Sequence, residues 1–96
     1  MDWDDYHPIE DMHSYLDYVE ETFDFVSTES IGKSYEGSDM RIVKVCKGGC
    51  GSKPAMWIDG GIHAREWISP ATVMYIMMEL LEHDADHPEM TESLDW

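Results

Sequence analysis

Basic residues are scarce in this sequence. Only 6 Lys and Arg residues stand against 21 Asp and Glu residues, which gives a formal net charge of -15 over 96 residues. A surface this acidic repels the phosphates of nucleic acids and the anionic headgroups of a membrane. We therefore expect no nucleic acid and no membrane among the partners.

Long hydrophobic runs are also missing. The longest apolar stretch, residues 71–81, is interrupted by Thr72 and Glu79 and is too short to cross a bilayer. Met1 is followed at once by acidic residues, so no signal peptide is visible. Hydrophobic residues make up 43% of the chain and charged residues 28%, which is typical of a globular protein. We expect a single folded unit over residues 1–96.

Cysteine is limited to Cys46 and Cys50, too few for a zinc site made of four cysteines. The flexible spacer between them, Lys47-Gly48-Gly49, would let them close a small disulfide loop. Such a loop suits a secreted protein. Two reduced thiols, or one half of a metal site, are the alternatives, and we favour the disulfide.

Two segments have the apolar period of a helix. Apolar residues recur in steps of three and four from Ile9 to Phe23, and Pro8 suits the first turn of that helix. A second helix is predicted from about Ser69, mostly buried. Its main apolar face is formed by Val73, Ile76, Met77 and Leu80. That face is widened by Met74, Met78 and Leu81. Polarity returns at residues 83–87, which are predicted to form a loop.

The remaining pattern predicts strands. Ser30 to Tyr35 and Met40 to Cys46 flank a Gly-containing turn, which predicts an antiparallel hairpin. Ala55 to Ile58 is a short continuous apolar run, typical of a strand that is covered on both faces. Helices and strands in this order indicate an α/β fold.

The segment between that strand and the second helix carries the candidate chemistry. His63 and Glu66 supply an imidazole and a carboxylate, both suitable zinc ligands, at the carboxyl end of the predicted strand. Arg65 adds a fixed positive charge, which suits a peptide carboxylate or carbonyl. The spacing alone favours simpler alternatives, namely that His63 caps the following helix and that Arg65 and Glu66 form an ordinary ion pair.

The complete segment from Ile58 to Thr72, IDGGIHAREWISPAT, resembles the first zinc-binding motif of the A/B-type metallocarboxypeptidases. Ile31 to Gly37 and Tyr6 to Val19 also look like the early strand and the first helix of that family. The likeness covers about residues 5–96 and implies the N-terminal portion of a mixed central β-sheet flanked by helices. It further implies that residues 1–96 are the N-terminal part of a zinc carboxypeptidase catalytic domain, truncated before its end.

The resemblance also implies roles. His63 and Glu66 match two of the family's zinc ligands, and Arg65 matches an arginine associated with peptide binding and transition-state polarisation. Zn²⁺ would be the cofactor, and the complete enzyme would be an extracellular hydrolase that removes residues from peptide or protein C-termini. The family's third ligand, a His, and its general base, a Glu, have no match here, so no catalytic base is assigned. His83 and His87 occupy no matched position and are interpreted as surface histidines.

This reading predicts that the chain alone is inactive, because catalytic zinc takes three protein ligands and a water. The alternative is a non-catalytic binding or regulatory product of the same fold, which would use its acidic surface or an exposed sheet edge. A third possibility keeps only the fold, with His63 and Glu66 as relics.

Overall fold

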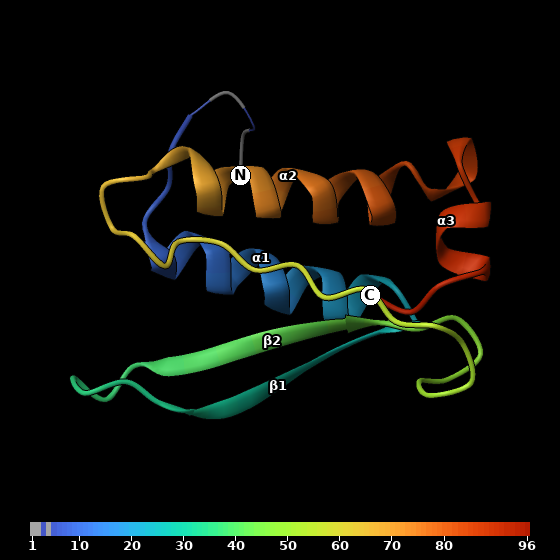
Figure 1. Cartoon of the computed structure of the whole chain (residues 1–96), viewed down its shortest axis with the longest axis horizontal. Helices are drawn as coiled ribbons and strands as arrows, with labels where there is room; N and C mark the ends of the chain where they lie inside the picture. The colour runs from blue at the N-terminus through green and yellow to red at the C-terminus, as the bar shows by residue number, and fades with distance from the viewer. Residues whose placement is uncertain (1–2, 4) are drawn as a thin grey trace.

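Two helices and a hairpin make up most of the regular structure in the computed structural model, which describes Trp3 and residues 5–96. In chain order the elements are α1 (Ile9–Thr22), β1 (Val26–Lys33), β2 (Asp39–Val45), α2 (Ile68–Glu82), the 3-10 turn η1 (Asp84–Asp86) and α3 (Glu89–Glu92). Figure 1 shows α1 between α2 and the β1–β2 hairpin. The core therefore forms on both sides of α1.

The first helix confirms the prediction made from its apolar period. It starts directly after Pro8, whose carbonyl accepts hydrogen bonds from the N–H groups of Asp11 and Met12. Proline has no N–H of its own to leave unpaired at this position. Leu16 and Val19 of the predicted stripe are buried. The amphipathic pattern thus predicted both the helix and the face that it buries.

The hairpin is also confirmed, with β1 beginning earlier than predicted. β1 starts at Val26 rather than Ser30, and Val26 pairs with Val45 in an antiparallel ladder. Both valines are buried, at the end of the hairpin farthest from its turn. The polar residues that follow Val26 hid this part of the strand, because they lie on an exposed hairpin that needs no apolar run.

The strand predicted over Ala55–Ile58 is wrong in the structure. Ala55 forms a single parallel bridge with Asp95, and residues 56–60 have no regular structure. Trp57 has an exposed fraction of 72%, and Met56 and Ile58 are exposed too. A buried strand needs hydrogen-bonded neighbours on both edges. Among the described residues, only the short segment at Asp95 provides one.

The second helix is confirmed, but its buried face is rotated from the predicted one. Of the predicted main face only Leu80 is buried, whereas all three residues expected merely to widen that face are buried: Met74, Met78 and Leu81. Val73, Ile76 and Met77 are half-buried and line a groove beside β2. The residues after the helix were predicted to be a loop, and this is wrong in part, because Asp84–Asp86 forms a 3-10 turn.

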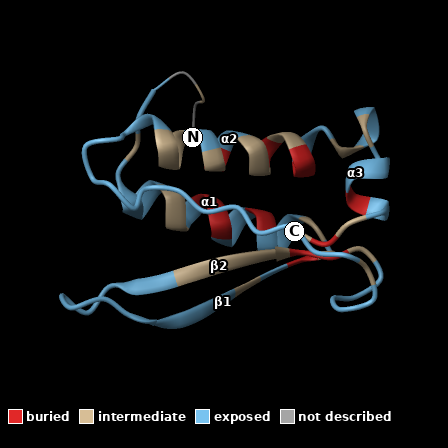
Figure 2. Ribbon diagram, viewed as in Figure 1, coloured by how far each residue is buried: buried red, intermediate tan, exposed pale blue. Residues whose placement is uncertain are grey.

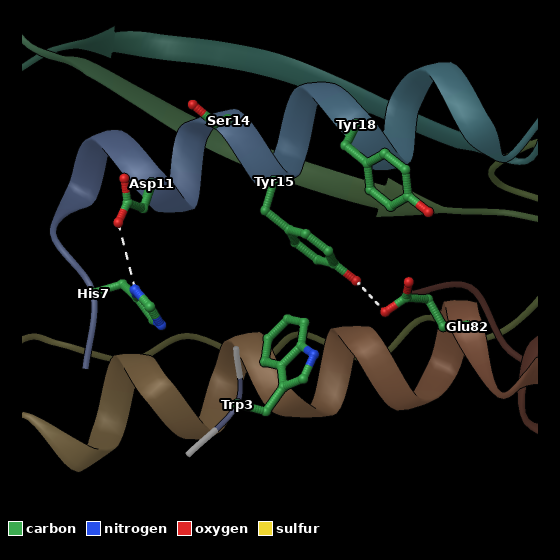
Figure 3. A pocket seen from close by; sticks show the side chains of 7 residues that line it. All are labelled: Trp3, His7, Asp11, Ser14, Tyr15, Tyr18 and Glu82. Atoms are coloured by element: carbon green, nitrogen blue, oxygen red, sulfur yellow. Dashed lines mark hydrogen bonds and ion pairs between the residues drawn. The ribbon is translucent and has the colours of Figure 1, made fainter. Parts of the chain in front are cut away.

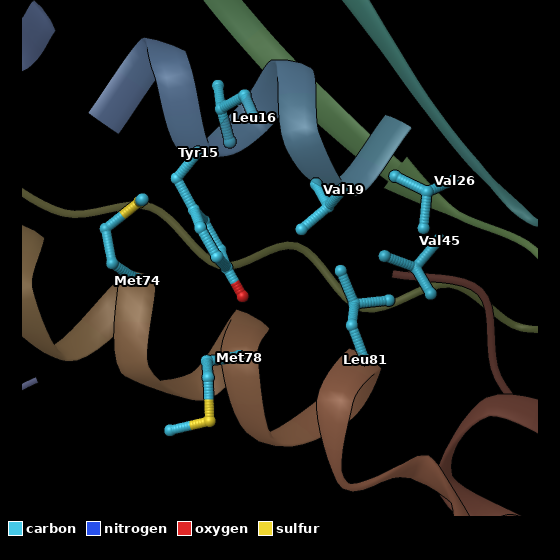
Figure 4. Packing of buried hydrophobic residues seen from close by; sticks show 8 residues of the cluster. All are labelled: Tyr15, Leu16, Val19, Val26, Val45, Met74, Met78 and Leu81. Atoms are coloured by element: carbon cyan, nitrogen blue, oxygen red, sulfur yellow. The ribbon is translucent and has the colours of Figure 1, made fainter. Parts of the chain in front are cut away.

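The hydrophobic core joins three elements. Eight buried residues pack together from α1, the hairpin and α2: Tyr15, Leu16, Val19, Val26, Val45, Met74, Met78 and Leu81 (Figure 4). Figure 2 shows these buried positions on the inner faces of the two helices and at one end of the hairpin. The long trace that follows Ala55 is exposed along its length in the same view.

A disulfide closes the loop after β2. Cys46 and Cys50 are bonded, with their Cα atoms 5.0 Å apart. The loop is held further by Lys53, whose ammonium donates hydrogen bonds to the carbonyls of Lys47 and Thr91. No helix within Trp3 and residues 5–96 is both long and apolar enough to cross a membrane.

Candidate metal centre

His63 and Glu66 lie in an irregular loop that leads into α2. The carbonyl of His63 accepts a hydrogen bond from the N–H of Glu66, and the carbonyl of Glu66 accepts one from Ser69. These two turns bring the side chains together, with 2.6 Å between Nδ1 of His63 and Oε1 of Glu66. Both side chains are exposed, at 71% for His63 and 52% for Glu66. The pair is therefore open to a ligand from solvent.

Gly60 and Gly61 set the path of this loop. A Cβ atom at Gly60 would come within 2.7 Å of Val73 Cγ2 and 2.9 Å of the Ser69 carbonyl oxygen. Gly61 has a φ of 86°, in the left-handed region that favours glycine, and its N–H donates to Ser69 Oγ at 3.0 Å. The close approach of residues 60–61 to the start of α2 fixes the position from which the backbone leads to His63.

Replacing Gly60 with alanine should destabilise the chain by about 1–3 kcal/mol, because the added methyl group overlaps both a side chain and a backbone oxygen. Urea unfolding of Gly60→Ala, followed by circular dichroism, measures the loss. In the double variant with Val73→Ala, the overlap with Val73 is relieved but the overlap with Ser69 is not. The two effects should therefore be non-additive, with part of the loss recovered. Strict additivity would show that the close approach does not limit this position.

Neither simple alternative for the His-x-x-Glu spacing is present. The N-cap residue of α2 is Trp67, and no side chain caps that helix. Glu66 pairs with His63 instead of Arg65. Arg65 is exposed and, within the described part of the chain, forms no ion pair or hydrogen bond. Its guanidinium is available to an anionic group.

The two histidines after α2 have other partners. His83 Nδ1 lies 3.6 Å from Asp86, and His87 Nε2 lies 3.4 Å from Glu79. Across Trp3 and residues 5–96, no three His, Cys, Asp or Glu side chains are grouped closely enough to hold a metal ion. Among the described His, Cys, Asp and Glu side chains, Glu66 is the one that contacts His63.

A second hollow lies between α1 and α2 (Figure 3). Its wall includes Tyr15, whose hydroxyl donates to Glu82 Oε2 at 3.0 Å, and Trp3, which meets the Tyr15 ring edge to face. Burial, followed by the hydrogen bond and the charge of Glu82, raises the pKa of Tyr15 well above its usual value. The tyrosine is therefore a neutral donor that ties the two helices together. Nothing in the sequence signalled the hydrogen bond between Tyr15 and Glu82, because the two residues are far apart in the chain.

The sequence profile of the zinc carboxypeptidases matches residues 12–96. This match covers nearly the whole chain, including the loop that carries His63 and Glu66. The chain belongs to the zinc carboxypeptidase family.

Individual zinc carboxypeptidases agree with this assignment. The chain is 40% identical to carboxypeptidase B of Astacus astacus over 97 residues, which cover 100% of this chain and 32% of that protein. It is 42% identical to zinc carboxypeptidase A 1 of Anopheles gambiae and 38% identical to carboxypeptidase A1 of Bos taurus. These matches cover 100% and 94% of this chain, and 22% of each relative. The chain thus spans about a third or less of the relatives it matches.

Solved structures confirm the predicted fold class. Bovine thrombin-activatable fibrinolysis inhibitor, in complex with tick carboxypeptidase inhibitor, matches with a TM-score of 0.82 at 34% identity, over 97% of this chain and 29% of that one. Carboxypeptidase A of Helicoverpa armigera matches with a TM-score of 0.86 at 26% identity, over 100% of this chain and 24% of that one. The helices and the two-stranded sheet are therefore a part of the α/β zinc carboxypeptidase fold.

The donor atoms of the pair fit zinc, as expected for a member of the zinc carboxypeptidase family. Imidazole nitrogen and carboxylate oxygen bind zinc at about 2.0–2.1 Å, so two ligands of one tetrahedral ion lie about 3.3 Å apart. The His63 and Glu66 atoms are 2.6 Å apart, and their exposure leaves them room to separate by that difference. A third protein ligand is needed to complete a catalytic site. The pair is suited to be part of a zinc site.

Proposed function

We propose that His63 and Glu66 are two protein ligands of the zinc ion in a metallocarboxypeptidase, and that Arg65 binds the peptide substrate. The observation that carries this proposal is the 2.6 Å contact between the two side chains, on an exposed loop inside the region that matches the family. An ordinary surface pair would give the same distance, but the profile match includes these positions.

The three residues have different tasks in this proposal. His63 and Glu66 hold the metal, and Arg65 attracts an oxygen of the substrate carbonyl or carboxylate by its fixed charge. Zinc, when bound, polarises the substrate carbonyl and lowers the pKa of the water that it binds. No residue of this chain is assigned as the general base that would move the proton. We therefore expect the isolated chain to have little or no hydrolytic activity.

The proposed substrates of the complete enzyme are peptides and proteins with a free C-terminus, from which it would remove the last residue. Zinc is the proposed cofactor. An extracellular location is also proposed, because the Cys46–Cys50 disulfide is stable in an oxidising compartment. Such a location matches the expectation drawn from the sequence.

One observation favours a second function, in which the chain binds another polypeptide without catalysis. An apolar groove of about 470 Å³ runs beside β2 and along α2. An apolar groove beside a β-strand can bind an extended segment. This function does not require zinc.

Zinc binding by the untagged chain tests the catalytic assignment. We expect weak binding in competition with a chromophoric chelator, and a further loss of about tenfold or more in His63→Ala, because one of two ligands is removed. The matched control is His83→Ala, which removes another exposed imidazole, one that is paired with Asp86. Its affinity should equal that of the unmodified chain.

Two results would contradict this assignment. Equal zinc affinity in His63→Ala and the unmodified chain would remove His63 from the ligand set. Turnover of a peptide with a free C-terminus by the isolated chain, abolished in His63→Ala, would contradict the predicted inactivity. Far-UV circular dichroism of both variants checks that the fold is retained.

A further inference from the structure

Ser69, the second residue of α2, contacts both ends of the loop that carries His63 and Glu66. Its side-chain Oγ accepts a hydrogen bond from the N–H of Gly61 at 3.0 Å. Its own N–H donates to the carbonyl of Glu66 at 3.0 Å. The first contact lies two residues before His63 in the chain, and the second is at Glu66 itself. A single residue therefore ties loop 61–66 to the helix at its beginning and at its end.

Loop 61–66 has little else to fix its position. All of its residues are exposed, so packing holds it only weakly. In the described part of the chain, its other hydrogen bonds join His63 and Glu66 to each other. The Glu66 N–H donates to the His63 carbonyl at 2.9 Å, and the two side chains are 2.6 Å apart. The hydrogen bonds that connect this pair of residues to α2 are those of Ser69.

A serine suits the contact with Gly61 because the backbone passes directly beside its side chain. A Cβ atom at Gly60 would lie 2.8 Å from Ser69 Oγ, so the space favours a short side chain. A hydroxyl oxygen accepts the Gly61 N–H, whereas alanine offers no acceptor. Gly61 is exposed, so water can satisfy its N–H when the hydroxyl is removed. Removing the hydroxyl should therefore release the loop without unfolding the chain.

The strength of metal binding depends on how well the ligands are held before the metal arrives. A free loop loses conformational freedom when two of its side chains converge on one ion, and this loss weakens binding. A loop that is already tied at both ends loses less freedom, so its ligands bind more tightly. Residues outside the ligand set can therefore change metal affinity through the backbone.

From these contacts we infer that Ser69 is a positioning residue for the proposed zinc site. Its hydroxyl holds Gly61 and its N–H holds Glu66, which keeps the imidazole of His63 and the carboxylate within reach of one metal ion. Ser69 is not itself a ligand and acts through the backbone of loop 61–66. This inference rests on the assignment of His63 and Glu66 as zinc ligands, and it adds a residue outside that pair.

Zinc binding by the untagged chain, in competition with a chromophoric chelator, tests this role. Ser69→Ala should weaken zinc binding by about three- to tenfold, a smaller effect than that of removing a ligand. Ser69→Thr keeps a hydroxyl at the same position and should restore the affinity to within about twofold of the unmodified chain. The matched control is Thr72→Ala, which removes an exposed hydroxyl that donates to the Ile68 carbonyl instead of contacting the loop. Its zinc affinity should be unchanged.

Amide hydrogen exchange in the absence of metal provides a second measurement. In Ser69→Ala, the Gly61 amide loses its acceptor and should exchange about tenfold faster or more. The Glu66 amide, which donates to the His63 carbonyl, should also exchange faster, because the loop that contains both residues is released. The amides of Met78 and Leu81, in the buried part of α2, should keep their rates. Ser69→Thr should show the exchange pattern of the unmodified chain.

The results distinguish this inference from the zinc assignment. If Ser69→Ala binds zinc as tightly as the unmodified chain while His63→Ala does not, His63 stays a ligand and the positioning role of Ser69 is wrong. The role is also wrong if Ser69→Thr binds zinc no better than Ser69→Ala, or if exchange accelerates throughout α2, which would indicate a general loss of structure. Equal zinc affinity in His63→Ala and the unmodified chain would overturn both the assignment and the inference.

Discussion

Replacing Leu81 with alanine is expected to lower the free energy of unfolding by about 2–5 kcal/mol, the range for removing a large buried side chain. Leu81 has an exposed fraction of 2% and is on α2. Its side chain is in the cluster that contains Val19 of α1 and Val45 of β2 (Figure 4). The substitution leaves a cavity where all three elements meet, so α2 loses its anchor on the rest of the fold.

Urea unfolding monitored by tryptophan fluorescence measures this loss, with the slope of the transition as a check on two-state behaviour. The control is Ile31→Ala, at an exposed position of β1, which should cost less than about 1 kcal/mol. A stabilising osmolyte keeps Leu81→Ala folded if it is too unstable in water alone. A loss no larger than that of Ile31→Ala would show that α2 does not depend on this core.

The parts of the fold that the sequence predicted are those specified locally. The α1 helix is recognisable because its apolar residues recur with the helical period, and the hairpin because a Gly-containing turn precedes a segment rich in β-branched residues. The prediction of a strand over Ala55–Ile58 was wrong because an apolar run indicates only that a segment can be buried. Whether it forms a strand depends on neighbours, and Asp95 is the only one in the described residues.

The face of α2 was misplaced for a related reason. Apolar residues surround most of this helix, so the pattern does not select one side. The structure buries Met78 and Leu81 against α1, and leaves Val73 and Ile76 along the groove beside β2. Periodicity alone gave no signal that a second, incompletely covered apolar surface exists on the same helix.

The candidate site was predictable to the extent that it is local. His63 and Glu66 are three residues apart in one turn, so their contact needs no distant part of the chain. The ties between distant segments could not be predicted, because single charged residues carry no signal of their partners. Lys53 with Asp95 and Lys47 with Asp84 are such pairs. Desolvation raises the pKa of Asp84, but hydrogen bonds from Lys47 and Thr91 outweigh it and keep that pKa below its usual value.

Replacing Lys53 with methionine is expected to lower the free energy of unfolding by about 3 kcal/mol, because it leaves a buried carboxylate without its cation. Lys53 Nζ is 3.6 Å from Asp95 Oδ1, and the two side chains are 17% and 6% exposed. Within the described residues, Oδ1 of Asp95 has no hydrogen-bond donor. The same ammonium donates to the carbonyls of Lys47 and Thr91, which also lose a donor. The size of the loss is measured by urea unfolding.

The matched control makes the same change at an exposed pair. Lys33 lies 2.8 Å from Asp39, with exposed fractions of 66% and 47%, so Lys33→Met should leave the free energy of unfolding nearly unchanged. The double variant Lys53→Met, Asp95→Asn separates charge from packing. Asparagine keeps an acceptor for the N–H of Gly51 but removes the buried negative charge, so part of the stability should return.

Loss of the Lys53–Asp95 pair should also weaken the hydrogen bonds at the edge of β2, because Asp95 directly precedes Trp96, which pairs with Val45. In Lys53→Met, the Val45 amide, which donates to the Trp96 carbonyl, should exchange faster, whereas the Cys46 amide, which donates to Phe25, should change less. Equal changes at both amides would indicate general loosening of the fold instead. A selective effect at Val45 would mean that the Lys53–Asp95 pair holds Trp96 in its backbone pairing with Val45.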